Sequence, residues 1–169
     1  MAEECVFCGI GAGKIPSKKV YEDSNSVAFL DINPRNPGHT LVIPKKHATT
    51  LSDMSPKDAG TLFSSVQKVA VAVKEATKAD GISIVQNNGK AAGQVVPHVH
   101  FHVIPRFETE GPVALEAVLP SKKLDDAAMN KIADSIKNSF GQAEEEPEEE
   151  PEKEETEEGE EEEEISFDF

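Results

Sequence analysis

Three of the five histidines in this 169-residue chain alternate with apolar residues, at His98, His100 and His102. On an extended segment, residues two apart point to the same face, so the three imidazoles form a row with about 7 Å between neighbours. The apolar residues between them then face the core, and these are Val99, Phe101 and Val103. A row of imidazoles in register is unusual as packing and indicates a functional site.

Three interpretations of this row stay open on the residues alone. The simplest is a run of surface histidines on an exposed sheet face. The second is a metal site, because imidazoles two apart on a strand can share one Zn²⁺, and a catalytic site needs three protein ligands and an open position. The third is covalent catalysis, because neutral imidazole, with a pKa of about 6.5, is a nucleophile at neutral pH and a good leaving group after attack on phosphorus.

Two cysteines, Cys5 and Cys8, stand three apart near the start of the chain. The first residues have neither the basic nor the apolar region of a signal peptide, so we expect a cytoplasmic or nuclear setting. In such a setting a reduced pair is favoured over a structural disulfide. The pattern serves both metal binding and redox chemistry, so it needs partners elsewhere in the chain.

The segments that must position these residues follow a mixed pattern. Short apolar runs bounded by turn residues predict strands at 26–31, 39–44, 82–86 and 97–105. A long amphipathic helix is predicted from Ser55, as its cap, to just before Gly81, because apolar residues recur there every three or four positions. A second helix is predicted after Asp125. Strands on both sides of one long helix indicate an α+β fold with an antiparallel sheet.

The net charge of −15 is confined to the end of the chain. Residues 144–169 hold 17 acidic residues and one basic residue, Lys153, which leaves 15 acidic and 16 basic residues in 1–143. We therefore predict a nearly neutral folded domain at 1–143 and an acidic, disordered tail at 144–169. No basic face for nucleic acid is expected, and no apolar stretch approaches the roughly 18 residues that cross a membrane.

The row of histidines belongs to a longer set of motifs. HVHFHVI at 98–104 resembles the histidine-triad pattern, and the motifs that accompany it in the same order are CVFC at 5–8, IPS at 15–17, VYED at 20–23, AFLDI at 28–32, PGHTLVIPKKH at 37–47 and NNG at 87–89. Residues from about 4 to 110 are covered, which is far more specific than one short motif. The chain resembles the histidine-triad (HIT) family, in its small bacterial and fungal type with an N-terminal CxxC zinc site.

The resemblance implies a homodimeric HIT-like fold and an enzyme that cleaves nucleotides at the α-phosphate. The substrate class is a purine nucleotide with adenine as the base, as a dinucleoside polyphosphate or a nucleoside phosphoramidate. His100 matches the family's nucleophile, which attacks phosphorus and holds the nucleoside monophosphate until water releases it. His102, with the amides near Gly93 and Gln94, is expected to donate to the nonbridging oxygens. We also place His98 in the catalytic set.

The same matching places the nucleotide over the histidine row. Asp31 is expected to accept from the ribose hydroxyls, or else to serve as a turn residue, and Asn87 to orient phosphate or ribose oxygens. The base and sugar pocket is expected to contain Phe7, Ile10, Phe29, Leu30, Ile32 and Leu41, each of which could equally be ordinary core. His39 is expected to be a buried histidine bonded to the backbone.

The resemblance implies that the two cysteines bind a zinc ion together with two histidines. The expected zinc ligands are Cys5, Cys8, His47 and His98, a Cys₂His₂ set that closes a tetrahedron and is therefore structural. The alternative is a pair of free reduced cysteines near a chain end.

The chain departs from many relatives at Val95, which stands where they carry serine or threonine able to assist the leaving group. Valine has no side-chain donor, so either its backbone amide suffices or assistance comes from elsewhere. The chain has no tryptophan and so lacks the Trp-Pro-Pro-Gly ending of the phosphoramidase branch of the family. Its Pro105-Arg106 after the triad is more similar to the dinucleoside polyphosphate hydrolase branch.

A function of another class is a nucleotide-binding interaction or sensing module that uses the acidic tail to contact basic partners. The simpler interpretation of the tail is a solvating spacer.

Overall fold

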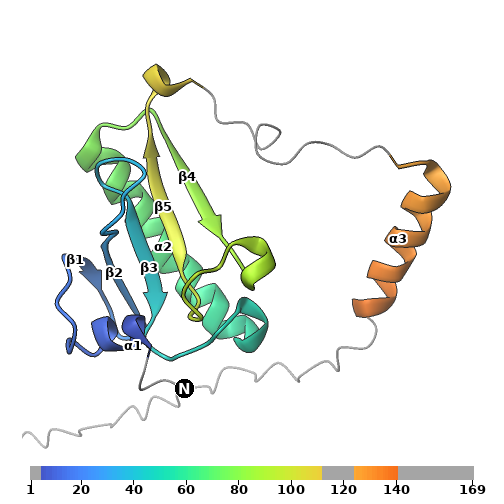
Figure 1. Cartoon of the computed structure of the whole chain (residues 1–169), viewed down its shortest axis with the longest axis horizontal. Coiled ribbons are helices and arrows are strands. Elements are labelled where there is room, and N and C mark those ends of the chain that lie inside the picture. Colours follow the sequence, from blue (N-terminus) through green and yellow to red (C-terminus); the bar gives the residue numbers. More distant parts are fainter. Residues whose placement is uncertain (1–4, 112–123, 141–169) are drawn as a thin grey trace, which may run out of the picture. The chain divides into compact units, whose positions relative to one another are not determined.

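The computed structural model of the chain describes residues 5–111 and 124–140, and it divides into a unit at Met1–Val118 and a unit at Leu119–Phe169 (Figure 1). The first unit is built on a five-stranded sheet in which every neighbouring pair is antiparallel, in the order β1-β2-β3-β5-β4. Its strands are β1 (Lys19–Glu22), β2 (Ser26–Leu30), β3 (Thr40–Pro44), β4 (Gly81–Gln86) and β5 (Phe101–Arg106). The predicted α+β class is confirmed.

One long helix, α2 (Pro56–Thr77), covers one face of the sheet. Its predicted start is confirmed, because the Ser55 hydroxyl accepts a hydrogen bond from the Asp58 amide at 3.1 Å. It ends at Lys78 in the left-handed conformation, with φ of 55°. Its apolar stripe forms one core cluster with the sheet, which includes Leu62, Val66, Val69, Val73, Val42, Val99, Phe101 and Val103. The prediction that the residues between the histidines face the core is confirmed.

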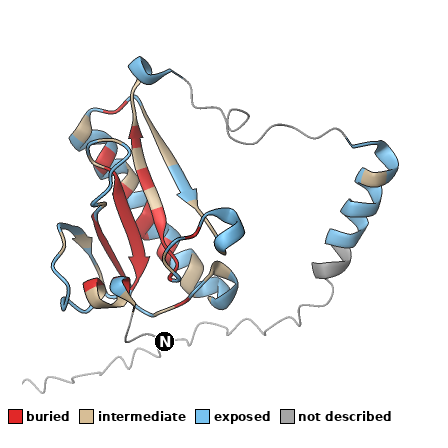
Figure 2. Ribbon diagram, viewed as in Figure 1, coloured by how far each residue is buried: buried red, intermediate tan, exposed pale blue. Residues whose placement is uncertain are grey.

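The opposite face of the sheet carries a second apolar cluster under α1 (Val6–Gly11), a helix that the sequence pattern did not predict. A helix of six residues is too short to show a 3.6-residue periodicity. The cluster consists of Phe7, Ile10, Val27, Phe29, Leu41 and Ile43. Because successive residues of a strand point to opposite faces, β2 and β3 supply both clusters, and every residue of β3 is buried (Figure 2).

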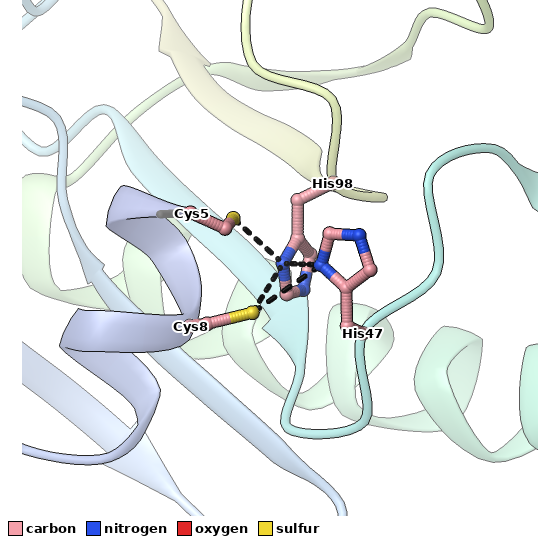
Figure 3. Close-up of side chains that lie close together, drawn as sticks. All are labelled: Cys5, Cys8, His47 and His98. Atoms are coloured by element: carbon pink, nitrogen blue, oxygen red, sulfur yellow. Dashed lines mark hydrogen bonds between the residues drawn. The ribbon is translucent and has the colours of Figure 1, made fainter. Parts of the chain in front are cut away.

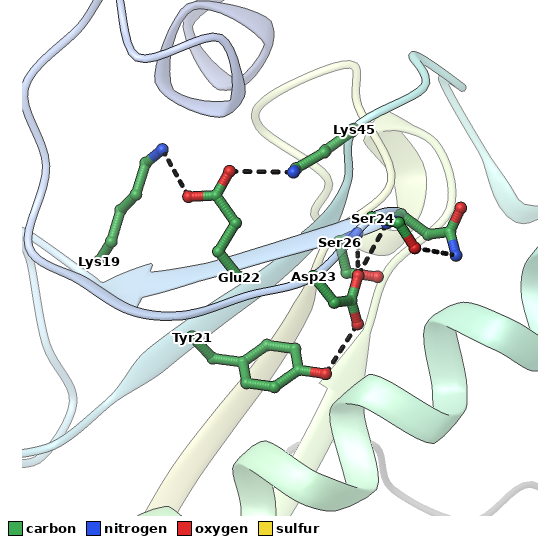
Figure 4. Close-up of polar contacts among 8 residues, drawn as sticks. Lys19, Tyr21, Glu22, Asp23, Ser24, Ser26 and Lys45 are labelled. Atoms are coloured by element: carbon green, nitrogen blue, oxygen red, sulfur yellow. Dashed lines mark hydrogen bonds and ion pairs between the residues drawn. The ribbon is translucent and has the colours of Figure 1, made fainter.

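Asp23 holds the turn between β1 and β2 (Figure 4), and through Ser65 it also ties this turn to α2. Its Oδ1 accepts from the amides of Asn25 and Ser26, while its Oδ2 accepts from the Tyr21 hydroxyl at 2.7 Å and the Ser65 hydroxyl at 2.9 Å. Burial alone would raise the pKa of Asp23, but these hydrogen bonds to the carboxylate lower it to about 2.

The histidine segment is extended, but only its second half is in the sheet. The predicted strand at 97–105 is corrected, because β5 begins at Phe101. The residues before it bond outside the β-ladder: the Val99 amide donates to the Ala48 carbonyl at 2.8 Å, and Pro97 has no amide hydrogen to donate. The connecting segments hold the short 3₁₀ turns η2 (Leu51–Asp53), η3 (Lys90–Ala92) and η4 (Glu108–Glu110).

The second unit contributes α3 (Asp126–Phe140) to the described residues. Its predicted cap is confirmed, because Asp125 Oδ1 accepts from the Ala128 amide at 2.7 Å. Within the described ranges, no helix combines the length and the apolar character needed to cross a bilayer. The predicted domain boundary and acidic tail at 144–169 lie outside the described residues and stay predictions.

Candidate active site and metal centre

The three histidines of the row lie on the sheet face that carries α1, opposite α2, but they have different surroundings. His98 is fully buried, His100 is 5% exposed and His102 is half-buried. The rings of His100 and His102 lie 5.0 Å apart between centroids, and the ring of Phe7 from α1 packs edge-on against His100 at 5.3 Å. The row is therefore partly covered by the N-terminal helix.

The ring of His100 is held by a backbone carbonyl. Its Nδ1 lies 2.7 Å from the carbonyl oxygen of His98, and only a protonated Nδ1 can donate to that oxygen. In the neutral ring, Nε2 then carries the lone pair. No described group forms a hydrogen bond with Nε2. Among the described residues, the buried side-chain atoms without a partner are the hydroxyls of Ser17 and Ser26. Because Nε2 of His100 is not one of these atoms, it is accessible to solvent. His100 has the tautomer of a nucleophile.

The ring of His102 is held by another histidine, His39. His39 Nε2 lies 3.0 Å from His102 Nδ1, while His39 Nδ1 accepts from the Arg35 amide at 3.1 Å. The expectation of a backbone bond to His39 is confirmed, but its contact with His102 was missed. His39 stands one residue before β3, whose pairing with β5 brings it to the triad.

Both of these rings are neutral near pH 7. Burial, followed by the nearby rings of His100 and His39, lowers the pKa of His102 to about 4. Burial also lowers the pKa of His39, although the Asp31 carboxylate opposes this effect. Asp31 itself is partly a turn residue, because its Oδ1 accepts from the Asn33 amide at 2.8 Å. The expected contact of Asp31 with ribose stays a prediction.

The second cluster of chemical groups joins both cysteines to two histidines (Figure 3). Cys5 Sγ lies 3.4 Å and Cys8 Sγ 3.5 Å from His98 Nδ1, and His47 Nδ1 lies 3.2 Å from the same nitrogen. All four ligand atoms lie within 4.8 Å of one another. The expected set is thus brought together from α1, the segment after β3 and the segment before β5.

The cluster passes a simple test of fit to zinc. Zinc–sulfur bonds of about 2.3 Å and zinc–nitrogen bonds of about 2.0–2.1 Å in a tetrahedron put neighbouring ligand atoms about 3.3–3.8 Å apart. The distances from His98 Nδ1 to the two sulfur atoms, 3.4 and 3.5 Å, fall in this range, and the 3.2 Å between the two histidine nitrogens is slightly shorter. In addition, His98 Nε2 lies 3.0 Å from the Pro44 carbonyl, so its proton is on Nε2 and Nδ1 is free to coordinate. The Cys5, Cys8, His47 and His98 cluster is compatible with zinc.

The ring of His98 is fully buried and its Nδ1 lies beside the cysteines, an arrangement that fits its expected place among the metal ligands, while its expected place in the catalytic set stays a prediction. Its contribution to the site comes through its carbonyl oxygen, which holds His100.

The expected apolar pocket is assembled only in part. Phe29, Leu41 and His102 are successive cross-strand partners on one face, and Val85 of β4, which we had not predicted, continues the same line. Phe7 and Ile10 of α1 pack against this face. Leu30 is a correction: the alternation along β2 puts it on the α2 face, where it lines an apolar cavity of about 320 Å³. Ile32 is 91% exposed in the loop after β2.

The loop between β4 and β5 is held from within by Gln94. Its Oε1 accepts from the Gly89 amide, and its Nε2 donates to the Thr49 carbonyl, both at 2.7 Å. The amides of Gly93 and Gln94 donate to carbonyls of Lys90 and Gly89, so these two expected phosphate donors already have partners.

Val95, the next residue of the loop, does not share the internal hydrogen bonds of Gln94. In the described chain no bond is formed by the Val95 amide, and its side chain is 90% exposed. Asn87 Nδ2 lies 3.9 Å from where a Cβ on Gly93 would stand, so Asn87 and Gly93 are neighbours.

A second described cavity, of about 360 Å³, lies away from the histidine row, between the ends of β2 and β3 and the start of α2. It is lined by Ser26, Lys45, His47, Asp58 and others, and neither cavity includes His100 or His102.

Comparison with known proteins places these features in one family. The family model described as HIT domain matches residues 12–109. An uncharacterized HIT-like protein of Methanocaldococcus jannaschii is 48% identical over 122 residues, which cover 72% of this chain and 94% of that protein. Adenylylsulfatase HINT3 of Arabidopsis thaliana is 40% identical over 134 residues, covering 79% of this chain and 68% of that protein.

Solved structures agree with the sequence relatives. A histidine triad nucleotide-binding protein from Candida albicans superposes with a TM-score of 0.71 at 32% identity, covering 82% of this chain and 98% of that one. A zinc-bound histidine triad family protein from Mycobacterium smegmatis has a TM-score of 0.63 at 35% identity, covering 85% and 100%. The chain, with its HIT-like fold and N-terminal cysteine pair, belongs to the HIT domain family.

Proposed function

We propose that this protein is a nucleotide hydrolase or nucleotidyl transferase that acts through a covalent nucleotidyl-His100 intermediate. The observation that carries the proposal is the ring of His100, whose Nδ1 proton is held by the His98 carbonyl at 2.7 Å while Nε2 is left with its lone pair. Splitting one displacement at phosphorus into two easier steps is the gain from such a nucleophile.

In the first step, Nε2 of His100 forms a bond to the α-phosphorus, and the bond from phosphorus to the leaving group breaks with its electron pair on the leaving group. Positive charge that develops on the ring is held by the His98 carbonyl through Nδ1–H. In the second step, water attacks phosphorus, the phosphorus–nitrogen pair returns to Nε2, and the water proton passes to solvent. Nucleoside monophosphate is released.

Charge also builds on the nonbridging phosphate oxygens during both steps, and two donors are available for them. His102, neutral above about pH 4, can donate from its ring, and the unpaired Val95 amide can donate from the loop. The backbone amides of Gly93 and Gln94 are already used inside the loop. Asp31 and Asn87 are proposed to bind the ribose and phosphate oxygens, and the face formed by Phe7, Phe29 and Leu41 to bind the base.

The substrate we propose is an adenine nucleotide carrying a leaving group on its α-phosphate. The support is the likeness to an adenylylsulfatase from Arabidopsis thaliana and to a nucleotide-binding protein from Candida albicans. Sulfate, an amine and a nucleoside polyphosphate are all chemically suitable leaving groups at His100.

We further propose that the Cys5, Cys8, His47 and His98 cluster holds a structural zinc ion. Four protein ligands close the tetrahedron and leave no position for water, so the donor set argues against metal-activated hydrolysis at this centre. The support is the ligand geometry and the zinc-bound relative from Mycobacterium smegmatis. When bound, the ion would pin α1 and the ring of His98 together.

A homodimer is also proposed from the family resemblance. It is supported by β4, an edge strand of the sheet whose Ile84 and Val85 are exposed. Light scattering on the purified protein tests it, and a monomeric mass at working concentration would contradict it.

The function is tested by trapping the intermediate. Adenylyl donors with a labelled α-phosphate should transfer label to the wild-type chain, and the label should resist alkali and be released by mild acid, as expected of a phosphorus–nitrogen bond. His100→Gln should bind AMP but take up no label, whereas Lys90→Gln, at an exposed position in η3, should behave like wild type. Full turnover by His100→Gln would overturn the proposal.

A further inference from the structure

The metal cluster has a closed side and a more open side. His98 has no exposed surface, whereas Cys5 and Cys8 are only half-buried (Figure 3). We propose that the two cysteines are an oxidative modification site, at which a hydroperoxide forms a reversible disulfide between Cys5 and Cys8 and so disassembles the metal centre. This inference rests on the part of the proposed function that assigns a structural zinc ion.

The two sulfur atoms are placed to form a bond with each other. They lie within 4.8 Å of one another, and the Gly9 amide donates to the Cys5 carbonyl at 3.0 Å, so Cys5 and Cys8 belong to one helical turn. Residues three apart on such a turn have Cα atoms about 5 Å apart, inside the range of about 4.4–6.8 Å that disulfides span. Rotation of the two side chains can therefore close the bond without unwinding α1.

The oxidation proceeds in two steps that balance. The sulfur of one cysteine thiolate attacks a peroxide oxygen, and the oxygen–oxygen bond breaks with its electron pair on the departing hydroxide, which leaves a sulfenic acid. The thiolate of the other cysteine then attacks this sulfur, and the sulfur–oxygen bond breaks with its pair on oxygen. The two thiols lose two electrons and hydrogen peroxide becomes two water molecules. The nearby second sulfur favours the disulfide over further oxidation to a sulfinic acid.

The disulfide removes half of the ligand set. Zinc is held by thiolates, and a sulfur atom in a disulfide carries no negative charge. Only His47 and His98 would remain of the four donors, which is too few for a structural site. We therefore expect one zinc ion to be released for each disulfide formed.

The fold should survive this change although the proposed nucleophile is affected. Phe7 and Ile10 hold α1 against the sheet through an apolar cluster that needs neither sulfur atom in its ionised form. The ring of His98 loses the partners at Nδ1 and keeps the Pro44 carbonyl at Nε2. Because the His98 carbonyl holds the ring of His100, nucleotidylation should slow by about 10-fold, as for loss of other outer-shell partners.

The first experiment treats the zinc-loaded full chain with hydrogen peroxide. A chromogenic chelator measures the zinc released, and intact mass and peptide mapping identify the product. We expect zinc release in step with the loss of two hydrogen atoms and a peptide that links Cys5 to Cys8. Retention of zinc and of both thiols while glutathione in the same solution is oxidised would overturn the proposal, as would a sulfinic acid without a disulfide.

The second experiment tests reversal with a matched variant. Dithiothreitol and zinc should restore the thiols, the metal content and the labelling rate of the oxidised wild-type protein. Cys5→Asp keeps an oxygen ligand for zinc but leaves Cys8 without a partner, so its oxidation should continue to the sulfinic acid and resist dithiothreitol. Equal recovery of Cys5→Asp and wild type would contradict the role of the pair.

The outcomes separate this inference from the proposals beneath it. If the wild-type chain cannot be loaded with zinc, the proposed metal centre has failed and the release of metal fails with it. If zinc is bound and no disulfide forms, the oxidative site alone is wrong. Neither result depends on label uptake at His100, which tests the proposed catalytic function.

Discussion

The carbonyl oxygen of His98 lies 2.7 Å from Nδ1 of His100, while the ring of His98 belongs to the cysteine and histidine cluster. One residue therefore connects the proposed zinc centre to the proposed nucleophile. Its Nδ1 faces Cys5 and Cys8, its Nε2 donates to the Pro44 carbonyl, and its backbone sets the tautomer of His100. Loss of the metal should therefore shift the backbone of His98 and, with it, the ring of His100.

The first prediction concerns this coupling. Cys8→Ser should remove zinc from the protein, lower the stability by on the order of 3 kcal/mol because a metal-linked helix is released, and slow nucleotidylation of His100. Metal content by atomic absorption, thermal unfolding and the labelling rate measure these effects. Val6→Ala, on the exposed side of the same helix, is the control and should retain one zinc per chain. A zinc-free Cys8→Ser protein with wild-type stability and rate would show that the centre is dispensable.

The second prediction concerns the donor beside the nucleophile. His102→Leu should lower the nucleotidylation rate by about 10²–10³, as for removal of an oxyanion donor, because the nonbridging oxygens lose a hydrogen bond in the transition state. AMP binding, measured by calorimetry, should weaken only a few-fold. Equal losses in binding and in rate would instead indicate that His102 serves the ground state.

The third prediction concerns the leaving group. Val95→Ser should leave stability within about 0.5 kcal/mol, because Val95 is 90% exposed. Its hydroxyl adds a donor that a poor leaving group needs, so turnover of phosphoramidates should rise by about 10-fold, equivalent to one hydrogen bond. Adenylyl sulfate should be unaffected, because sulfate departs without a proton. Val95→Thr should repeat the pattern, and an equal gain for all substrates would refute the assignment.

The fourth prediction concerns pH and the turn at Asp23. The pKa of this group is about 2 in the folded chain and about 3.9 when unfolded, so its carboxylate stabilises the fold above pH 3.9 and this contribution is lost as pH falls toward 2. Asp23→Asn should cost about 2 kcal/mol near neutral pH and progressively less as pH falls through this window. Urea unfolding at several pH values measures the difference from wild type. Glu22→Gln, at an exposed ion pair with Lys19 and Lys45, should show little cost. A cost of Asp23→Asn that is constant with pH would contradict the assignment.

The helices and the core-facing residues of the histidine segment could be predicted from the sequence because their patterns are local. The period of apolar residues in α2, the Ser55 and Asp125 caps and the alternation of histidines with core residues each depend on neighbours a few positions away. The four metal-cluster residues came from resemblance rather than from spacing, and the structure brought them together.

What the sequence could not decide depends on contacts between distant segments. The face to which Leu30 points, the turning of His98 toward the cysteines and the bond from His39 to His102 all follow from strand register and loop packing, which no local pattern contains. The sequence by itself determined that reactive imidazoles alternate along one segment. Only the tertiary structure decided which ring lies against the two cysteines, which ring has a backbone carbonyl beside Nδ1 and which ring has another histidine there, because these partners come from distant segments.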